Sequence, residues 1–170
     1  MDTEMQNIAT MRSAIEALNR GDIDGCTSLM RDDFIINLAG MPYQKHGLTA
    51  WRENVRIMRT ALPDLKVRVD DIFASGDKLA VRATLTGTHR GEFLGNAPTG
   101  RNVNYLSYEI YRFEDGKLAE EWICSDSVTM MTQMGAFSQW RMVTMWLTGF
   151  RLWLGLAIGF AIGLAAGMLL

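Results

Sequence analysis

The sequence predicts an α+β fold in which helices come first, an antiparallel sheet follows, and an apolar helix ends the chain. Three observations predict it: apolar residues at helical spacing before Pro63, a period of two from there to residue 126, and no charge between 152 and 170. Helices followed by consecutive strands are typical of α+β domains with the helices on one face of the sheet. With 170 residues, the chain has room for one domain of about 140 residues and a tail.

Before Pro63 the apolar spacing predicts three helices and one short strand. The first helix ends near Gly21, and Asp22 is the predicted N-cap of the second. Thr49 is the predicted N-cap of the third, which stops ahead of Pro63. Residues 34–38 are apolar and partly β-branched, which favours a strand. The apolar face of the first helix consists of Ile8, Met11, Ile15 and Leu18.

After Pro63 the apolar residues alternate, as in half-buried strands. Gly76-Asp77 and Asp115-Gly116 are typical of tight turns between antiparallel strands. The glycine-rich run from 91 to 100 is expected to connect two long strands. The predicted strands are 67–73, 79–89, 103–113 and 118–126.

The segment from Val128 to Phe150 is rich in methionine and tryptophan. Two interpretations stay open: a helix at a membrane surface, or a linker helix packed on the domain. We therefore expect a soluble domain over 1–136, an interfacial or linker helix over 137–151, and a transmembrane helix over 152–170.

The charge-free segment would span roughly 28 Å as a helix, close to the ~30 Å hydrocarbon core of a bilayer. Glycines recur in it at every fourth position, which places them on one side of the helix. A stripe without side chains allows another helix to approach closely, so a membrane helix or a second copy is the expected partner. The stripe consists of Gly155, Gly159, Gly163 and Gly167.

The charge distribution predicts where the domain lies and what it does not bind. Arg141 and Arg151 precede the predicted span and no positive charge follows it, so the domain is expected in the cytoplasm. The net charge of −2 without a clustered basic face argues against nucleic acid as a partner. Cys26 and Cys124 have no metal-ligand spacing, and we expect reduced thiols and no metal.

The run TGTHRGEFLGNAPTGRNV is followed by EIYRFEDGKLAEEW, by Asp126, and by QMG at residues 133–135. In order and spacing, these motifs resemble the SnoaL-like polyketide and ester cyclase family, over residues 5 to 136. The resemblance implies the cone-shaped α+β fold shared with nuclear transport factor 2, in which a curved antiparallel sheet wraps around helices and leaves an apolar pocket. It also implies chemistry without a cofactor.

The resemblance implies a catalytic aspartate in the last strand, which acts as acid and base in an intramolecular aldol ring closure. The matching residue is Asp126, and burial in an apolar pocket would raise its pKa toward neutrality. Strand alternation places Trp122 and Cys124 on the same face, which predicts an aromatic wall. The alternative is that Asp126 caps a segment beginning at Ser127.

Two further candidates lie on the predicted inner face of the sheet. His89 is either a satisfied core residue or a catalytic partner of Asp126. Glu109 occupies a position where some cyclases of the family carry a second pocket histidine. It could pair with His89, act as a second carboxylate, or face solvent. Glu109 shares its strand face with Tyr105, Ser107 and Tyr111.

Two functions fit these observations. The first is an accessory subunit of a larger membrane assembly, such as a photosynthetic or respiratory complex, held by the glycine stripe. The stripe favours this function because a plain anchor needs only apolar bulk, and glycine lowers helix propensity. The alternative is a membrane-tethered, cofactor-independent cyclase, isomerase or hydrolase that acts on a lipophilic carbonyl compound.

Overall fold

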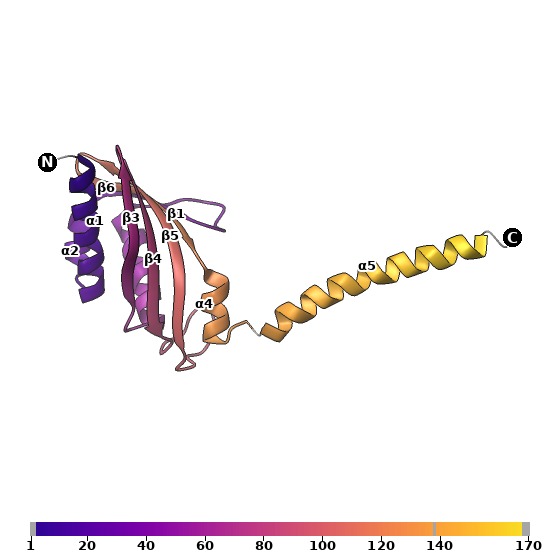
Figure 1. Ribbon diagram of the computed structural model, residues 1–170. Helices are drawn as coiled ribbons and strands as arrows, with labels where there is room; N and C mark the ends of the chain where they lie inside the picture. The colour runs from indigo at the N-terminus through magenta and orange to yellow at the C-terminus, as the bar shows by residue number, and fades with distance from the viewer. Residues whose placement is uncertain (1–2, 138, 168–170) are drawn as a thin grey trace.

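A computed structural model describes residues 3–137 and 139–167. Six strands form one curved sheet in the order β2-β1-β6-β5-β4-β3, and α1 and α3 pack against it (Figure 1). The helices are α1 (Thr3–Arg20), α2 (Ile23–Ser28), α3 (Gly47–Ala61), α4 (Ser127–Met134) and α5 (Gln139–Gly167). The strands are β1 (Met30–Leu38), β2 (Lys45–His46), β3 (Lys66–Ser75), β4 (Lys78–Thr88), β5 (Asn102–Glu114) and β6 (Lys117–Ser125).

The sheet is antiparallel at every pair except β1 with β6, which run parallel. Asn37 on β1 lies opposite Trp122 on β6 in this parallel ladder. A parallel pair needs a long crossover between its strands, and the chain from β2 to β5 supplies it. The prediction of a wholly antiparallel sheet is therefore wrong at this one position.

The local capping signals were predicted with mixed success. Asp22 caps α2 as predicted, because its carboxylate accepts a hydrogen bond from the Gly25 amide at 2.8 Å. The N-cap of α3 is His46, whose side chain makes no capping hydrogen bond, so the prediction of Thr49 as a cap is wrong. The chain enters α3 through Gly47 at φ +81°, a conformation that glycine adopts without strain.

The strands after Pro63 follow the predicted alternation closely. Leu79, Val81 and Ala83 on β4 are buried on the face toward the helices. At the β5–β6 turn, Asp115 and Gly116 both have positive φ, at 51° and 75°. Two positive φ angles are typical of a type I′ turn, which joins twisted antiparallel strands tightly.

The interior consists of two apolar clusters. The larger lies between α1, α2, α3 and the sheet and includes the fully buried Phe34 and Ile36 of β1. The smaller lies under α4, where Met130 and Met134 pack with Tyr105 of β5. Helix α4 therefore closes one end of the sheet and belongs to the domain, as the linker-helix interpretation expects for this part of the segment.

Helix α5 continues from Gln139 to Gly167 without a break near residue 151 and extends away from the sheet (Figure 1). Among the described residues, no helix is both long enough and apolar enough to cross a membrane. The predicted transmembrane helix at 152–170 is thus not supported, and residues 168–170 lie outside the described residues. A Cβ added at Gly155 or Gly159 would meet no atom within 4 Å, so a partner for the glycine stripe stays a prediction.

Candidate functional site

The inner face of β5 carries a row of polar side chains within the apolar interior. Tyr105, Ser107, Glu109 and Tyr111 alternate toward the helices, which confirms the predicted shared face. The two tyrosines and Ser107 are buried, whereas Glu109 is partly exposed. This row is the most polar part of the inner sheet face and is the candidate site.

Hydrogen bonds fix the Glu109 carboxylate on both of its oxygens. Ser107 Oγ donates to Oε1 at 2.6 Å, and the Tyr111 hydroxyl donates to Oε2. Ser107 Oγ lies 2.9 Å from Ser125 Oγ. Because the Ser107 proton points to Glu109, Ser125 is the donor in that pair. An ionised carboxylate accepts on both oxygens in this way.

A second carboxyl group, Glu121 of β6, lies directly across from Tyr111 on the same face. It is 3% exposed, and its burial raises its pKa well above the ordinary value. The negative charge of Glu109 raises this pKa further. Glu121 was not among the predicted site residues, because the expected inner face of β6 carried Trp122 and Cys124, and alternation then places Glu121 on the opposite face.

Cys26 of α2 is buried in the core, within electrostatic range of Glu121. Burial, and then the charge of Glu121, raises the pKa of this thiol to about 12. Its Sγ donates to the Ala14 carbonyl at 3.5 Å. Cys26 is therefore a neutral thiol in the core at physiological pH. It forms no disulfide in the described part of the chain, in agreement with the predicted reduced state.

His89 lies at the end of β4 and is fully buried, which confirms its predicted inward direction. Its Nδ1 is 3.1 Å from Thr99 Oγ1, and Thr99 Oγ1 donates to the Met134 carbonyl at 3.0 Å. Because Thr99 gives its proton to Met134, the Nδ1 atom of His89 carries the hydrogen that Thr99 accepts. This chain of hydrogen bonds ties the 91–100 loop to the end of α4.

The predicted pairings of His89 are not formed. The His89 amide bonds to the Arg101 carbonyl, and Glu109 lies farther along β5, roughly 26 Å away at ~3.3 Å per residue. Asp126 caps the first turn of α4, whereas Thr99 links His89 to Met134, the last residue of that helix. His89 is thus placed in the α4 cluster, apart from the carboxyl groups.

Asp126 lies at the N-cap of α4 and is exposed. Its carboxylate accepts from the Thr129 amide at 2.9 Å and from Thr129 Oγ1 at 2.6 Å. These hydrogen bonds lower the pKa of Asp126, opposite to the expected direction. The capping alternative is confirmed and the pocket-facing position is wrong, because β6 ends at Ser125 and the face that Asp126 was expected to share with Trp122 and Cys124 is the outer one.

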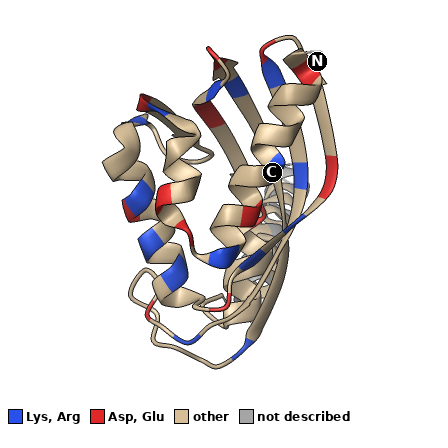
Figure 2. Ribbon diagram, turned by 90° about the vertical axis from the view of Figure 1, so that its left-hand side faces the viewer, with Lys and Arg blue, Asp and Glu red and all other residues tan. Residues whose placement is uncertain are grey.

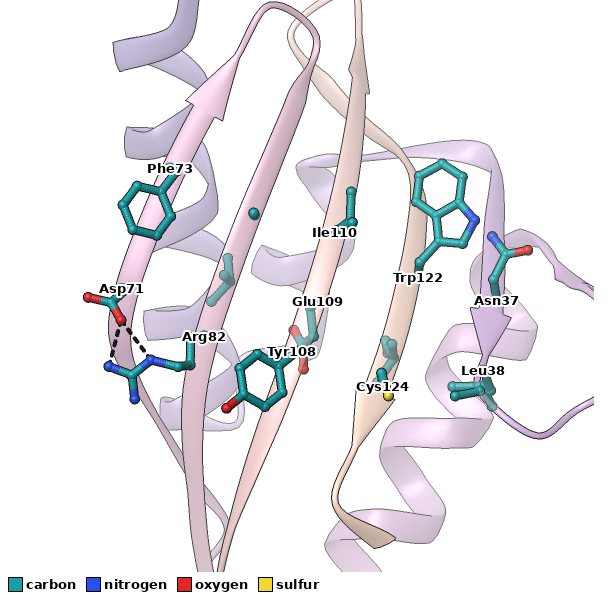
Figure 3. A pocket seen from close by; sticks show the side chains of 14 residues that line it. Asn37, Leu38, Asp71, Phe73, Arg82, Tyr108, Glu109, Ile110, Trp122 and Cys124 are labelled. Atoms are coloured by element: carbon teal, nitrogen blue, oxygen red, sulfur yellow. Dashed lines mark hydrogen bonds and ion pairs between the residues drawn. The ribbon is translucent and has the colours of Figure 1, made fainter.

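Trp122 and Cys124 share a face as predicted, but it is the outer face of the sheet. Cys124 is exposed, with Tyr108 opposite it in register. Trp122 and its neighbours line an open groove of about 610 Å³ on this face (Figure 3). The aromatic wall therefore lies across the sheet from Glu109 and Glu121. Aromatic and apolar residues of the groove include Phe73, Ala80, Tyr108, Ile110 and Trp122.

Charged residues are distributed over the surface rather than gathered on one face. Figure 2 shows positive and negative positions interspersed along helices and strands. In the groove, Arg82 is held by Asp71 at 2.5 Å, so this cation is already paired. Within the described part of the chain, no group of three histidine, cysteine, aspartate or glutamate side chains is arranged to hold a metal ion.

A family comparison covers most of the domain. A model of the SnoaL-like polyketide cyclase family matches residues 8–134. The chain belongs to this family. The matched region ends at the last residue of α4, so α5 lies outside the SnoaL-like part.

Several SnoaL-like relatives are similar in sequence and structure. The aklanonic acid methyl ester cyclase AcmA of Streptomyces galilaeus is 27% identical over 115 residues, 66% of this chain and 79% of that protein. IdmH, a putative polyketide cyclase from Streptomyces antibioticus, is 33% identical, with a TM-score of 0.68 and coverage of 76% and 99%. AclR, a putative hydroxylase from Streptomyces galilaeus, is 29% identical, with a TM-score of 0.71 and coverage of 79% and 99%.

Proposed function

We propose that this SnoaL-like protein is a cofactor-independent cyclase of lipophilic carbonyl compounds, with Glu109 as the catalytic base. The observation that carries the proposal is the Glu109 carboxylate, fixed by Ser107 and Tyr111 in the polar row of the inner sheet face. Its partial exposure allows a ligand to reach it. This assignment replaces Asp126, which is exposed at the N-cap of α4 and lies off the inner face.

A carboxylate in this position suits the removal of a proton next to a carbonyl group. Glu109 takes the proton from the α-carbon, and the resulting enolate carbon attacks a second carbonyl of the same molecule. One carbon–carbon bond forms, and the new alkoxide oxygen takes up one proton. The product has the same mass as the substrate, and no oxidant, reductant or leaving group takes part.

The relatives favour the enzyme over the accessory-subunit prediction. One curated relative is named as the cyclase of aklanonic acid methyl ester, and IdmH as a putative polyketide cyclase. We infer a polyketide-type substrate with an ester or ketone group for this chain. A membrane location, a cytoplasmic orientation and a partner helix stay predictions, and fractionation of cell membranes from cytosol tests the first of them.

Turnover of aklanonic acid methyl ester by the purified full chain tests the proposal. Liquid chromatography with mass spectrometry should find a product of unchanged mass and a new retention time. Loss of the base in Glu109→Gln should lower kcat by ~10²–10⁴-fold.

Two matched variants serve as controls for this experiment. Glu120→Gln removes a carboxylate from the outer face of the sheet, and Asp126→Asn keeps a capping side chain. Both should retain kcat within roughly threefold of the wild type, since surface changes leave the inner row intact. Full activity in Glu109→Gln would contradict Glu109 as the base, and an inert wild-type protein would contradict the substrate class.

A further inference from the structure

Ring closure needs a proton donor for the oxygen that becomes negative, as well as a base. Most of the protic groups on the inner face near Glu109 have already committed their protons. Ser107 and Tyr111 donate to Glu109, and Ser125 donates to Ser107. Cys26 donates to the Ala14 carbonyl. None of these four hydrogens points toward a ligand.

The carboxyl group of Glu121 differs from these groups. In the described part of the chain its two carboxyl oxygens have no hydrogen-bond partner, and only its backbone carbonyl is bonded, by Asn37 Nδ2 at 2.9 Å. An ionised carboxylate with neither a cation nor a donor is very unfavourable in an apolar interior. The group is therefore neutral when the site is empty, and burial together with the Glu109 charge raises its pKa in that direction.

We propose that Glu121 is the catalytic acid of this site, whose unshared carboxyl proton binds the carbonyl oxygen of the ligand and is transferred to it. The inference rests on the proposed function, in which Glu109 is the base. The register of the two strands places the two carboxyl groups near each other. Glu109 lies opposite Ile123 and Glu121 lies opposite Tyr111, so they occupy neighbouring inward positions on β5 and β6. Glu121 is buried, whereas Glu109 is partly exposed.

The proton balance of the pair closes over one turnover. Before the reaction Glu109 is ionised and Glu121 is protonated, so the pair holds one negative charge. Glu109 gains the α-proton and Glu121 loses its proton to the alkoxide, and the charge has then moved to Glu121. Return of one proton from Glu109 to Glu121 restores the starting state. Two carboxyl groups held in different protonation states are a general arrangement for acid and base work.

Infrared difference spectroscopy on the native full chain tests the proton directly. At neutral pH the spectrum should contain the C=O stretch of a protonated carboxyl group, which is absent in Glu121→Gln and retained in Glu120→Gln. Addition of a dihydroxyanthraquinone as a probe should shift this band, because the carboxyl then donates to the quinone carbonyl. Absence of the band, or a band that the bound probe does not shift, would overturn the inference.

Kinetics with aklanonic acid methyl ester separates this inference from the proposed function. Glu121→Gln keeps a hydrogen-bond donor but cannot transfer a proton, so kcat should fall ~10²-fold or more while KM stays within about threefold. Glu121→Met replaces the buried carboxyl with an apolar side chain of similar size, so it should melt at a higher temperature than the wild type. Loss of activity in this variant therefore cannot be explained by misfolding. Normal kcat in Glu121→Gln together with loss in Glu109→Gln would refute the acid and leave the cyclase intact. Loss in neither variant would refute both.

Discussion

The two faces of the sheet carry opposite kinds of surface, although their residues alternate along the same strands. On the inner face, Glu121 is buried and Glu109 is partly exposed, and neither forms an ion pair with a basic residue in the described part of the chain. On the outer face, aromatic side chains are open to solvent, and the acidic Asp71 is paired with Arg82 (Figure 3). The carboxyl groups without a counter-ion therefore lie where water is scarce, and the aromatic groove lies where water is abundant.

Two consecutive glutamates make the comparison sharpest. Glu120 points outward, where its carboxylate lies 3.3 Å from Arg112 Nε and 3.1 Å from Asn37 Nδ2. Glu121 points inward, and its carboxyl group has no such partner among the residues that the structure describes. The same side chain is thus an ordinary ion-pair member on one face and a candidate acid on the other. Direction, rather than residue type, decides which chemistry is available.

The largest expected contrast between the faces is in stability. Ile36 is fully buried under the inner face, whereas Ile110 is 47% exposed on the outer face. Ile36→Ala should lower the free energy of unfolding by about 2–5 kcal/mol, because it leaves a cavity in a packed core. Ile110→Ala should change it by less than about 1 kcal/mol.

Urea denaturation of both alanine variants checks this contrast. The two substitutions remove the same atoms, so any difference comes from the surroundings. Equal losses would indicate that another molecule covers the outer face in solution, and a dependence of the midpoint on protein concentration would identify that molecule as a second copy.

A smaller effect is expected from the protonation of Glu121. The folded protein keeps this proton after the unfolded chain has lost it, so the stabilising effect is complete below pH ~4.5 and declines as pH rises toward the folded pKa. Because the folded and unfolded chains differ by at most one bound proton at this group, the free energy of unfolding changes by at most ~1.4 kcal/mol per pH unit. Unfolding free energies measured across this range should show the decline in the wild type and lack it in Glu121→Gln. An identical decline in Glu121→Gln would assign it to another group.

The smallest effect is expected at Asp126, where the sheet ends. Asp126→Ala removes both hydrogen bonds to Thr129 and should lower Tm by roughly 2–4 °C. Asp126→Asn keeps a capping side chain, so its Tm should stay close to that of the wild type. Because its folded pKa is lowered, the stabilising effect of Asp126 is present above pH ~3.8 and is lost as pH falls further. Thermal melts of the three proteins check this. A large loss of activity in Asp126→Asn with little change in Tm would indicate that Asp126 takes part in the reaction.

Most of the fold could be predicted from the sequence because alternation and helical spacing are local signals. The hairpin at Asp115-Gly116 and the buried face of β4 follow directly from them. The parallel pairing of β1 with β6 could not be predicted in this way, because it joins residues far apart in the chain. The predicted cap at Thr49 failed because the chain enters α3 through Gly47 instead.

The site was predicted in part. The shared face of Ser107, Glu109 and Tyr111 follows from alternation alone. Asp126 was misplaced because the face of β6 that carries Trp122 and Cys124 was expected to point inward but is the outer face, and because Asp126 itself lies past the strand, at the N-cap of α4. Glu121 was overlooked for the same reason, since alternation places it outward when Trp122 and Cys124 are assigned inward.

The parallel pairing of β1 with β6 also affects how the chain reaches its folded state. Phe34 and Ile36 emerge early in synthesis, but the strand beside them, which includes Trp122, is made much later. At ~5–20 residues per second, the ribosome leaves these apolar side chains without their neighbouring strand for several seconds. Pairing of such distant segments also slows folding, because a long loop must close first. The nascent domain therefore has a defined window in which chaperones can bind it, and this window closes only when β6 has left the ribosome.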